Sequence, residues 1–350
     1  MPDRFVKIYF PGPRVGPQTA RNAGSGSRGV VLVVLLWVLA IVSLMTLSFT
    51  KSIRIEFNAA RNNKDKVTAH YLARTGMAES LYRLLRRTAL PAPVAPTADT
   101  ALLPPDDLDL GFVTSDFPQG RVTTRIMDEN GKINLNFTTE EVYHRLFAAI
   151  GVEKERADMI IDSILDWVDA DKNHRLNGAE DEYYMSLDPP YRAKNGPFDT
   201  VEELLLVQGM TPELFYGIKV KDEQGRILER YGLVNYLTVY TFSIQINLNS
   251  APLPVLMAIP DMEPQFAQML YERRLVKPFL NMAEVSQTSA AALGRAAEWL
   301  SVGRKSNCFS LESTAEIPGS RIKNTLRSII VIDPQESVGY RTIYWNEMVR

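Results

Sequence analysis

The feature that most constrains this chain is a run of twenty residues without a charged side chain, from Val30 to Phe49. A helix rises about 1.5 Å per residue, so the run spans roughly 30 Å, the thickness of the hydrocarbon core of a bilayer. Lipid can surround a helix because its backbone N–H and C=O groups are hydrogen-bonded within it. The sequence therefore predicts one transmembrane helix over residues 30–49, with the rest of the chain working at the membrane surface.

The segment before this run is basic. Residues 1–29 hold five Lys or Arg and one Asp, and they end in Gly29. A secretory signal would have a shorter apolar core, followed by a small-residue cleavage site. An ordinary uncleaved anchor with a cytoplasmic tail remains open, since a basic flank favours the cytoplasmic side. The charge asymmetry is weak, however, because five basic residues follow the run: Lys51, Arg54, Arg61, Lys64 and Lys66.

Composition limits the classes of protein to which the chain can belong. Of 350 residues, about 260 remain for a soluble body, enough for one large domain or two ordinary ones. The formal net charge is −2, so the chain lacks the basic field of a nucleic-acid binder. Cys308 is the single cysteine, which excludes an intrachain disulfide, and three histidines do not favour a multi-histidine metal site.

The pattern of apolar residues predicts that the helix continues beyond the membrane, to about Thr88. No proline occurs between Val30 and Pro91, and apolar residues follow steps of three and four, as on one face of a helix. The predicted buried stripe consists of Phe57, Ala60, Val67, Tyr71, Ala78, Leu81 and Leu85.

Beyond Pro91 the residue pattern changes twice, from strand-like to helical and back to strand-like, which predicts an α+β fold. Alternating β-branched residues predict a strand at 121–127 and, after a turn at 128–131, a second strand at 132–136. Helical spacing follows at 140–150, 157–168 and 200–207, and Thr211-Pro212 begins another helix. Strand patterns return at 309–317, 322–332 and 340–345. A helical block is therefore expected between the early and late strands of one sheet.

The helical block contains a short internal sequence repeat. Ile133-Asn-Leu-Asn136 and Ile246-Asn-Leu-Asn249 each precede a helical set, which predicts two related modules. Both resemble helix-hairpin-helix modules of the sterile-alpha-motif-like (SAM-like) class. Many of those bind DNA phosphate through a glycine-rich hairpin, but the turn at 259–264 has two prolines, two carboxylates and no glycine. We therefore expect no nucleic-acid partner.

Candidate metal ligands are concentrated in an acidic stretch from Asp166 to Asp181. Counted from Asp169, Asp or Asn occupies positions one, three, five and nine, and Glu180 occupies position twelve. This is most of an EF-hand loop, but His174 stands where the sharp turn requires glycine. The spacing favours a calcium loop of another geometry. A solvated acidic loop, with its carboxylates bonding local N–H groups, remains the alternative.

Catalysis finds little support in the sequence. Asp166 and Asp169 lie three residues apart and could form an acid–base pair on one helix face. No recognisable nucleophile motif and no glycine-rich phosphate loop accompanies them, and packing between helices is the expected role of the aromatic residues around the acidic loop. We therefore expect a protein that is not an enzyme.

The junction at Gly29 resembles a type IV prepilin leader. In that family a dedicated prepilin peptidase cuts after the glycine, which places the cut here between Gly29 and Val30. Ordinary pilins have glutamate at the fifth mature position, which is Val34 in this chain. The subfamily that lacks this glutamate is the K minor pseudopilin of type II secretion.

Further motifs carry the same resemblance. They are Asp128-Glu-Asn-Gly-Lys-Ile-Asn-Leu-Asn136, Ile164-Leu-Asp-Trp-Val-Asp-Ala-Asp171, Asn177-Gly-Ala-Glu-Asp181, Tyr183-Tyr184, Asn195-Gly-Pro-Phe198 and Val201-Glu-Glu-Leu204. The helical domain of that family binds calcium. By resemblance the ligands here are Asp169, Asp171, Glu180 and Asp181, with Asn173 as a weaker candidate.

The resemblance implies assembly and protein export as the function. It predicts a structural subunit at the tip of the pseudopilus, in a complex with the minor pseudopilins I and J, which initiates assembly with the major pseudopilin. Exported proteins and the outer-membrane secretin are further expected contacts. The expected location is the inner membrane of a Gram-negative cell, single-pass, with the soluble body in the periplasm. Two alternatives stay open: a periplasmic binding or adaptor protein on an uncleaved anchor, and a minor pilin of a related type IV pilus.

The expected domain organisation follows from these patterns and the resemblance. A long helix, first transmembrane and then amphipathic, packs on a small pilin-like antiparallel sheet into which a large all-α domain is inserted. The segments are a leader (1–29), a transmembrane helix (30–49), its amphipathic continuation (50–88), early scaffold strands (89–138), the inserted domain with two SAM-like modules (139–305) and late scaffold strands (306–350).

Overall fold

The computed structural model of the chain describes residue 12 and residues 27–89, 111–221, 227–302 and 306–349. Contacts within the chain divide it into two units, residues 1–61 and residues 62–350. Most of the predicted leader, and residues 90–110 of the predicted early scaffold, lie outside the described residues.

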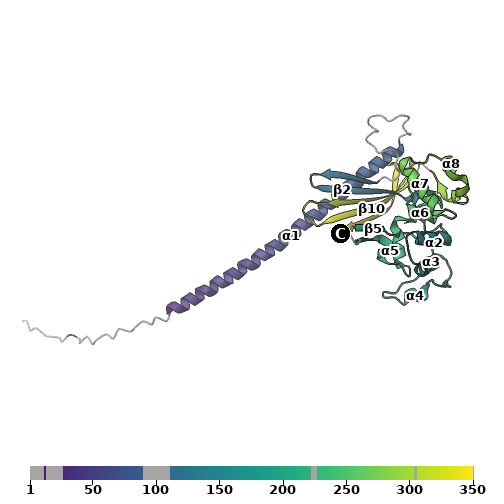
Figure 1. The fold of residues 1–350 in the computed structure, drawn as a ribbon. Coiled ribbons are helices and arrows are strands. Elements are labelled where there is room, and N and C mark those ends of the chain that lie inside the picture. The colour runs from purple at the N-terminus through teal and green to yellow at the C-terminus, as the bar shows by residue number, and fades with distance from the viewer. Residues whose placement is uncertain (1–11, 13–26, 90–110, 222–226, 303–305, 350) are drawn as a thin grey trace, which may run out of the picture. The chain divides into compact units, whose positions relative to one another are not determined.

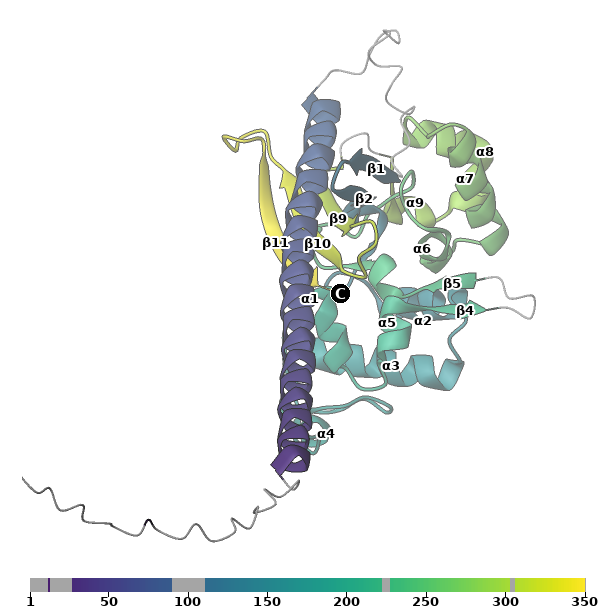
Figure 2. The same ribbon diagram turned by 90° about the vertical axis from the view of Figure 1, so that its left-hand side faces the viewer.

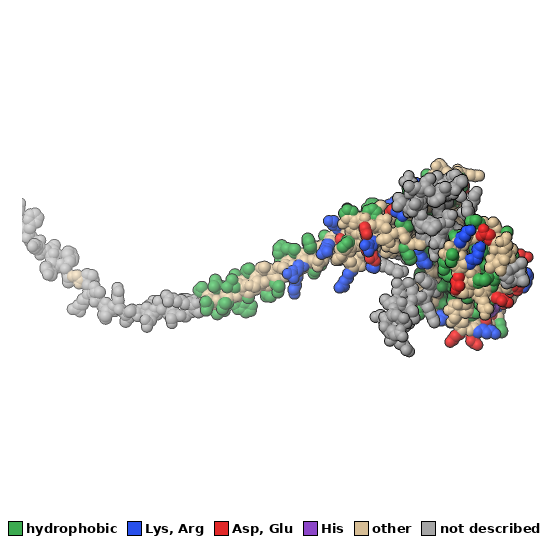
Figure 3. Space-filling view, turned by 45° about the horizontal axis from the view of Figure 1, so that its top comes forward, with side chains coloured by type: hydrophobic (Ala, Val, Ile, Leu, Met, Phe, Trp, Pro, Cys, Tyr) green, Lys and Arg blue, Asp and Glu red, His purple; other side chains and the backbone are tan. Residues whose placement is uncertain are grey.

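The first unit is dominated by the apolar part of helix α1, which runs from Ser27 to Ala89 and continues into the second unit. Every side chain from Val30 to Arg61 is exposed, and Figure 3 shows the apolar ones gathered along this segment. Thr46 and Thr50 each donate a 2.8 Å hydrogen bond to the carbonyl four residues earlier, so their hydroxyls are satisfied within the helix. Among the described helices α1 alone is long and apolar enough to cross a membrane.

The second unit is built on a five-stranded antiparallel sheet, β1-β2-β9-β10-β11. Its strands are β1 (Phe112–Phe117), β2 (Gly120–Asp128), β9 (Cys308–Glu316), β10 (Lys323–Ile332) and β11 (Tyr340–Val349). Leu72, Ala73 and Met77 of α1 share a buried cluster with Val122 and Leu326 of the sheet. This part of α1 lies along the sheet (Figure 2). The mixed α+β fold and the three late strands are therefore confirmed, whereas β1 was not predicted.

Helix α1 meets the sheet through a face that differs from the predicted stripe. Val67, Tyr71 and Ala78 are exposed, and the buried positions are instead Ala69, Leu72, Ala73, Gly76, Met77, Ser80 and Leu84. The reason is close packing, because a Cβ added to Gly76 would lie 2.2 Å from Cγ1 of Val122. Small residues therefore allow the sheet to approach closely at this face. Leu81 of the predicted stripe is partly buried against the same cluster, so the predicted face is shifted rather than wrong at every position.

Between β2 and β9 the chain forms the helical insertion (Figure 1). Its first part comprises η1 (Glu129–Gly131), β3 (Ile133–Asn134), α2 (Glu140–Ala149), α3 (Lys154–Val168), α4 (Asp181–Met185), η2 (Val201–Leu206), α5 (Pro212–Tyr216), β4 (Gly217–Lys221), β5 (Ile227–Tyr231), η3 (Leu233–Asn235) and β6 (Leu237–Thr238). Its second part comprises β7 (Ile246–Asn247), α6 (Leu253–Ala258), α7 (Pro264–Val276), α8 (Met282–Leu293), α9 (Ala296–Trp299) and β8 (Leu300–Ser301).

Three expectations for the insertion need correction. The predicted strand at 132–136 does not join the main sheet, because η1 turns the chain away and β3 pairs in parallel with β6. The predicted helix at 200–207 is a 3₁₀ helix, and the antiparallel pair β4–β5 was not predicted. The insertion therefore contains short strands as well as helices.

The two Ile-Asn-Leu-Asn motifs occupy equivalent places. Ile133 and Ile246 each begin a two-residue strand that pairs in parallel with a later one. The side-chain amide of Asn136 makes a reciprocal pair of hydrogen bonds, 2.8 and 2.9 Å, with the backbone of Phe198. Asn249 makes the same pair with Phe279, at 2.9 Å each.

The repeat continues after each phenylalanine with a helix start. In the first module the Thr200 and Asp199 N–H groups donate to Glu203, which forms a capping box. In the second, Asn281 caps α8, and the Leu280 N–H donates to Glu284. The two modules thus share a second motif: Pro-Phe, followed two residues later by Thr or Asn and three residues after that by Glu. It supports two related modules.

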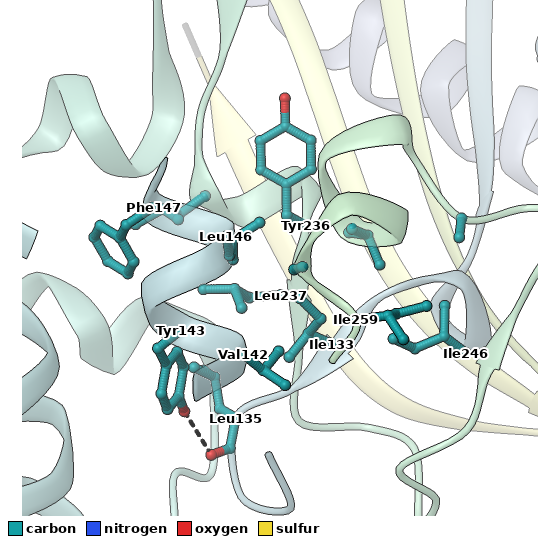
Figure 4. Close-up of a cluster of buried hydrophobic side chains, with 14 of the residues drawn as sticks. Ile133, Leu135, Val142, Tyr143, Leu146, Phe147, Tyr236, Leu237, Ile246 and Ile259 are labelled. Atoms are coloured by element: carbon teal, nitrogen blue, oxygen red, sulfur yellow. Dashed lines mark hydrogen bonds between the residues drawn. The ribbon is translucent and has the colours of Figure 1, made fainter. Parts of the chain in front are cut away.

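The main core of the insertion lies around α2. Figure 4 shows Val142 beside Ile133 of the first Ile-Asn-Leu-Asn motif and Ile246 of the second beside Ile259, and the Tyr143 hydroxyl donates a 2.8 Å hydrogen bond to the Leu135 carbonyl. Burial of Tyr143 raises the pKa of its phenol. This core is continuous across both modules, so the insertion packs as one body.

A polar network joins the main sheet to the insertion. At the end of β2 the buried Asp128 carboxylate accepts hydrogen bonds from Asn247 (2.9 Å), Ser250 (2.6 Å) and Ser306. Next to it, Lys132 Nζ lies 2.5 Å from Glu129 Oε1, and both side chains are almost fully buried. Buried polar groups need such partners, so this network fixes how the insertion leaves the sheet.

Candidate metal centre

The acidic loop begins where helix α3 ends. The N–H of Asp169 donates to the Leu165 carbonyl, which makes Asp169 the C-terminal cap of α3. The last turn of α3 contains no basic residue. A helix C-terminus carries a partial negative charge, so carboxylates there are unfavourable unless a cation is close by.

Three of the five predicted ligands converge in the structure. Carboxylate oxygens of Asp169, Asp171 and Glu180 all lie within 4.8 Å of one another. Glu180 is 5% exposed, and both of its carboxylate oxygens, together with Oδ1 of Asp169, are buried without a hydrogen-bond partner among the described residues. A buried carboxylate without a donor is costly. The group therefore offers oxygen ligands, negative charge and buried carboxylate oxygens without hydrogen-bond donors, which together suit a hard divalent cation.

The other two predicted ligands lie apart from this group. The Asn173 side chain is exposed, and its backbone N–H donates a 2.7 Å hydrogen bond to Oδ1 of Asp171. Oδ1 of Asp181 accepts from the Ala193 N–H at 3.1 Å, and its Oδ2 lies 4.0 Å from Arg192. In this arrangement Asn173 shapes the turn around Asp171, and Asp181 ties the loop to the segment before Pro197.

Asp166 acts as a clamp beneath the loop. Its carboxylate is fully buried and accepts from the Arg175 N–H at 3.1 and 3.2 Å. Arg175 in turn lies 3.2 Å from Glu140 of α2. A Cβ on Gly178 would lie 1.9 Å from the Asp166 carboxylate, so only glycine lets the loop approach this closely.

The electrostatics of the cluster oppose full ionisation. Burial raises the pKa of Glu180, and the negative charges of Asp166 and Asp169 raise it further. Burial likewise raises the pKa of Asp166, against the opposing effect of the Arg175 N–H. A bound cation would favour the charged forms of both groups.

These shifts predict how stability varies with pH when divalent cations are chelated. An acid whose pKa is higher in the folded chain binds its proton more tightly there, so its penalty is complete at neutral pH and disappears as the pH falls through the raised pKa. Glu180→Gln is therefore expected to stabilise the metal-free chain at pH 7, and this advantage should shrink toward pH 5. Urea unfolding across this range measures it, and an advantage that does not depend on pH would contradict the assignment.

Two residues that sequence reasoning missed support the loop. Asn195 has a positive φ of 50° and donates to the Asp171 carbonyl at 3.3 Å. Its buried Oδ1 lacks a hydrogen-bond partner among the described residues. Asp162 accepts two 3.0 Å bonds from Asn177. The available signal for Asn195 was the dipeptide Asn195-Gly196, which is typical of turns.

Aromatic side chains pack behind the loop, as the sequence predicted for Trp167, Tyr184 and Phe198, which are all buried. The Trp167 ring lies edge-on to Tyr184 at 5.3 Å and stacks with Phe198 at 6.5 Å. This cluster holds the end of α3 against the segment that carries Asn195.

The predicted processing residues lie at the start of α1. Gly29 and Val30 fall within its first turn, because the helix begins at Ser27, slightly earlier than expected. The side chains of Val30 and Val34 are 64% and 56% exposed. The roles of Gly29, Val30 and Val34 remain predictions.

Family models match two stretches of the chain. Both models are described as type II secretion system (T2SS), protein K; the first matches residues 126–219 and the second matches residues 246–303. The first range covers most of the first module, up to β4, and contains the acidic loop, and the second range covers the second module.

Individual relatives agree with the models. The chain is 27% identical over 266 residues to the type II secretion system protein K of Pseudomonas aeruginosa, covering 71% of this chain and 73% of that protein. It is 29% identical over 203 residues to the protein K of Klebsiella pneumoniae, covering 54% of this chain and 60% of that protein.

A solved structure shares the fold. A chain in the crystal structure of the GspK-GspI-GspJ complex from the type 2 secretion system of enterotoxigenic Escherichia coli matches with a TM-score of 0.54 and 20% identity. The match covers 83% of this chain and 99% of that one. Together, the two family models, the relatives and the fold establish that this chain belongs to the type II secretion system protein K family.

Proposed function

We propose that the chain is a minor pseudopilin that occupies the tip of the type II secretion pseudopilus, initiates its assembly and supports protein export. The observation that carries this proposal is helix α1, whose exposed apolar half precedes a half that packs on an antiparallel sheet. A helix of this kind can serve both as a membrane anchor and as the packing element of a filament. The role is structural, and no residue is assigned to catalysis.

The proposed partners follow from the family and from the complex in which the similar fold was solved. They are the minor pseudopilins I and J, the major pseudopilin and the prepilin peptidase, with exported proteins and the secretin as further contacts. The proposed location is the inner membrane of a Gram-negative cell, with the body after the apolar helix in the periplasm. The sheet serves as a pilin-like scaffold, and the inserted modules are of the SAM-like, helix-hairpin-helix type.

We further propose calcium as the ion of the acidic loop, held by Asp169, Asp171 and Glu180. We add the oxygen of the Asn195 amide to this set, because it is buried without a hydrogen-bond partner among the described residues and its side chain reaches the loop. Asp181 and Asn173 lie outside this group, and they would act as ligands only in a loop that closes further around the ion.

Processing at Gly29 tests the proposed class of protein. Co-expression with a prepilin peptidase is expected to yield a mature chain that begins at Val30, seen by mass spectrometry and N-terminal sequencing of the membrane-extracted protein. Gly29→Leu should block the cut, and Gly26→Leu serves as the control within the leader. A leader retained in every sample would favour the fixed, single-pass adaptor instead. Partners recovered from a pilus system would favour the related type IV pilin.

The apolar residue Val34 supports the tip position by a physical argument. A carboxylate in lipid is costly unless it has a partner, and in ordinary pilins that partner is the N-terminal amine of the neighbouring subunit above. A tip subunit has no such neighbour. Val34→Glu is therefore expected to reduce pseudopilus initiation, counted as filaments per cell, whereas Val34→Leu should not. Unchanged filament counts for Val34→Glu, with the subunit found along the filament, would contradict the tip position.

A further inference from the structure

The side of α1 just beyond the apolar run carries a one-sided basic pair. Lys51 and Arg54 lie about 60° apart around the helix axis at the usual 100° per residue, whereas Glu56 lies roughly 140° from Lys51, on the other side. All three side chains are exposed, and Lys51 and Arg54 form no ion pair with any other described residue. Figure 3 shows Lys and Arg side chains following the apolar segment.

The position of this pair along the helix matches a specific layer of the bilayer. At about 1.5 Å per residue, Lys51 lies roughly 3 Å and Arg54 roughly 7.5 Å beyond Phe49. The headgroup layer extends about 5–8 Å beyond the hydrocarbon core. Both cationic groups are therefore at the depth of lipid phosphates, and their long aliphatic stems can remain along the apolar surface.

The rest of the chain carries a net charge opposite in sign to that of this pair. Residues 62–350 contain 31 basic and 39 acidic residues, a net charge of −8. An acidic body is repelled from an anionic membrane surface, whereas a basic pair in the headgroup layer is attracted to it. The leader contributes four net positive charges, and these are lost if processing occurs at Gly29, which leaves Lys51 and Arg54 as the basic residues nearest to the bilayer.

We propose that Lys51 and Arg54 bind anionic phospholipid headgroups in the leaflet on the side of the soluble body. This binding rests on the proposed membrane anchoring of α1. It sets the depth of the helix and holds the mature subunit in the bilayer until a filament extracts it. The same two cations could instead pair with carboxylates on the helix of a neighbouring pseudopilin, and the experiment below separates these outcomes.

The test uses the full chain reconstituted in phosphatidylcholine vesicles that contain phosphatidylglycerol, at about 0.15 M salt, where the Debye length is about 8 Å. Electron paramagnetic resonance compares how strongly spin-labelled phosphatidylglycerol and spin-labelled phosphatidylcholine associate with the protein. A preference for phosphatidylglycerol on the order of fivefold or more is expected. K51Q/R54Q should bring the ratio close to one. R61Q/K64Q removes the same charge roughly 18 Å or more beyond Phe49 and should leave the ratio unchanged.

Each other outcome has a definite meaning. An unchanged ratio in K51Q/R54Q overturns the proposal, as does an equal loss in both double variants, which indicates diffuse attraction rather than a site. A ratio near one in the unmodified chain, with loss of pseudopilin co-purification in K51Q/R54Q, overturns it in favour of pairing between helices. Failure of the anchor is seen separately, because alkaline carbonate would then release the chain from the vesicles.

Discussion

Replacing Lys132 with methionine is expected to destabilise the folded chain by about 3–5 kcal/mol, because it leaves the buried carboxylate of Glu129 without its counter-ion. Lys132 Nζ lies 2.5 Å from Glu129 Oε1, and the two side chains are 3% and 0% exposed. Burial alone would raise the pKa of Glu129, but the ammonium of Lys132 holds it below its usual value. The free energy of unfolding, measured with urea on the detergent-solubilised chain, checks this expectation.

The pH dependence of the effect identifies its cause. In the unmodified chain the low pKa of Glu129 contributes stability above the usual carboxyl range, and this contribution is lost as the pH falls through that low pKa. In Lys132→Met the largest effect that opposes the burial of Glu129 is gone, so the folded chain gains stability when this carboxyl is protonated. The difference between the two proteins should therefore shrink from pH 7 toward pH 4.

Two matched variants separate this explanation from a general loss of packing. Arg121→Met breaks the ion pair with Asp116, 2.7 Å long and with both side chains more than 60% exposed, and should change the free energy of unfolding very little because solvent screens the pair. The double variant Glu129→Leu/Lys132→Met removes both buried charges and should recover much of the lost stability. Equal costs for Lys132→Met and Arg121→Met would contradict the role assigned to the buried pair.

The sequence predicted the order and type of the helices and strands better than it predicted which residues contact one another. Helix α1 and strands β2, β9, β10 and β11 follow from apolar periodicity, which records which residues can be buried. The phase of α1 was wrong because Tyr71 fits an amphipathic pattern, whereas the sheet requires the small residues Ala73 and Gly76. Periodicity does not record how closely a second element approaches.

Other errors arose where distant residues decide local structure. The segment 132–136 has the composition of a strand, but its partner is β6, about a hundred residues later. The repeated Pro-Phe motif was overlooked because its two copies follow the Ile-Asn-Leu-Asn motifs at different distances. In the first module residues 169–196 separate α3 from Pro197, whereas in the second only Lys277 separates α7 from Pro278. The acidic loop thus belongs to an insertion in one copy of the repeat.

Chelation of divalent cations is expected to lower the melting temperature of the chain by roughly 4 °C relative to the calcium-loaded protein. A ligand present at 100 times its Kd stabilises the folded state by about 2.7 kcal/mol. An unfolding entropy of about 2.1 cal/mol/K per residue makes a unit the size of residues 62–350 shift by roughly 1.6 °C per kcal/mol. Differential scanning calorimetry with added calcium or with a chelator measures the shift. Magnesium is the control ion, since it fits flexible carboxylate loops less well.

The calcium effect should depend on the three converging carboxylates. Asp171→Ala/Glu180→Ala is expected to abolish the difference between calcium and chelator. Glu155→Ala/Glu182→Ala removes the same charge from exposed positions outside the group and should preserve it. Loss of the calcium response in both double variants would indicate a diffuse effect of net charge, not a site.

The metal-free proteins provide the decisive comparison between a metal loop and a solvated acidic loop. If the carboxylates repel one another without a cation, Asp171→Ala/Glu180→Ala should be at least as stable as the unmodified chain under chelation, because it removes two mutually repelling charges, of which the one on Glu180 is buried. If the loop is instead held by carboxylate hydrogen bonds to local N–H groups, the same variant should be less stable under chelation. The bond from the Asn173 N–H to Asp171 would then be lost, whereas Glu180, which has no hydrogen-bond partner among the described residues, would contribute nothing to that loss.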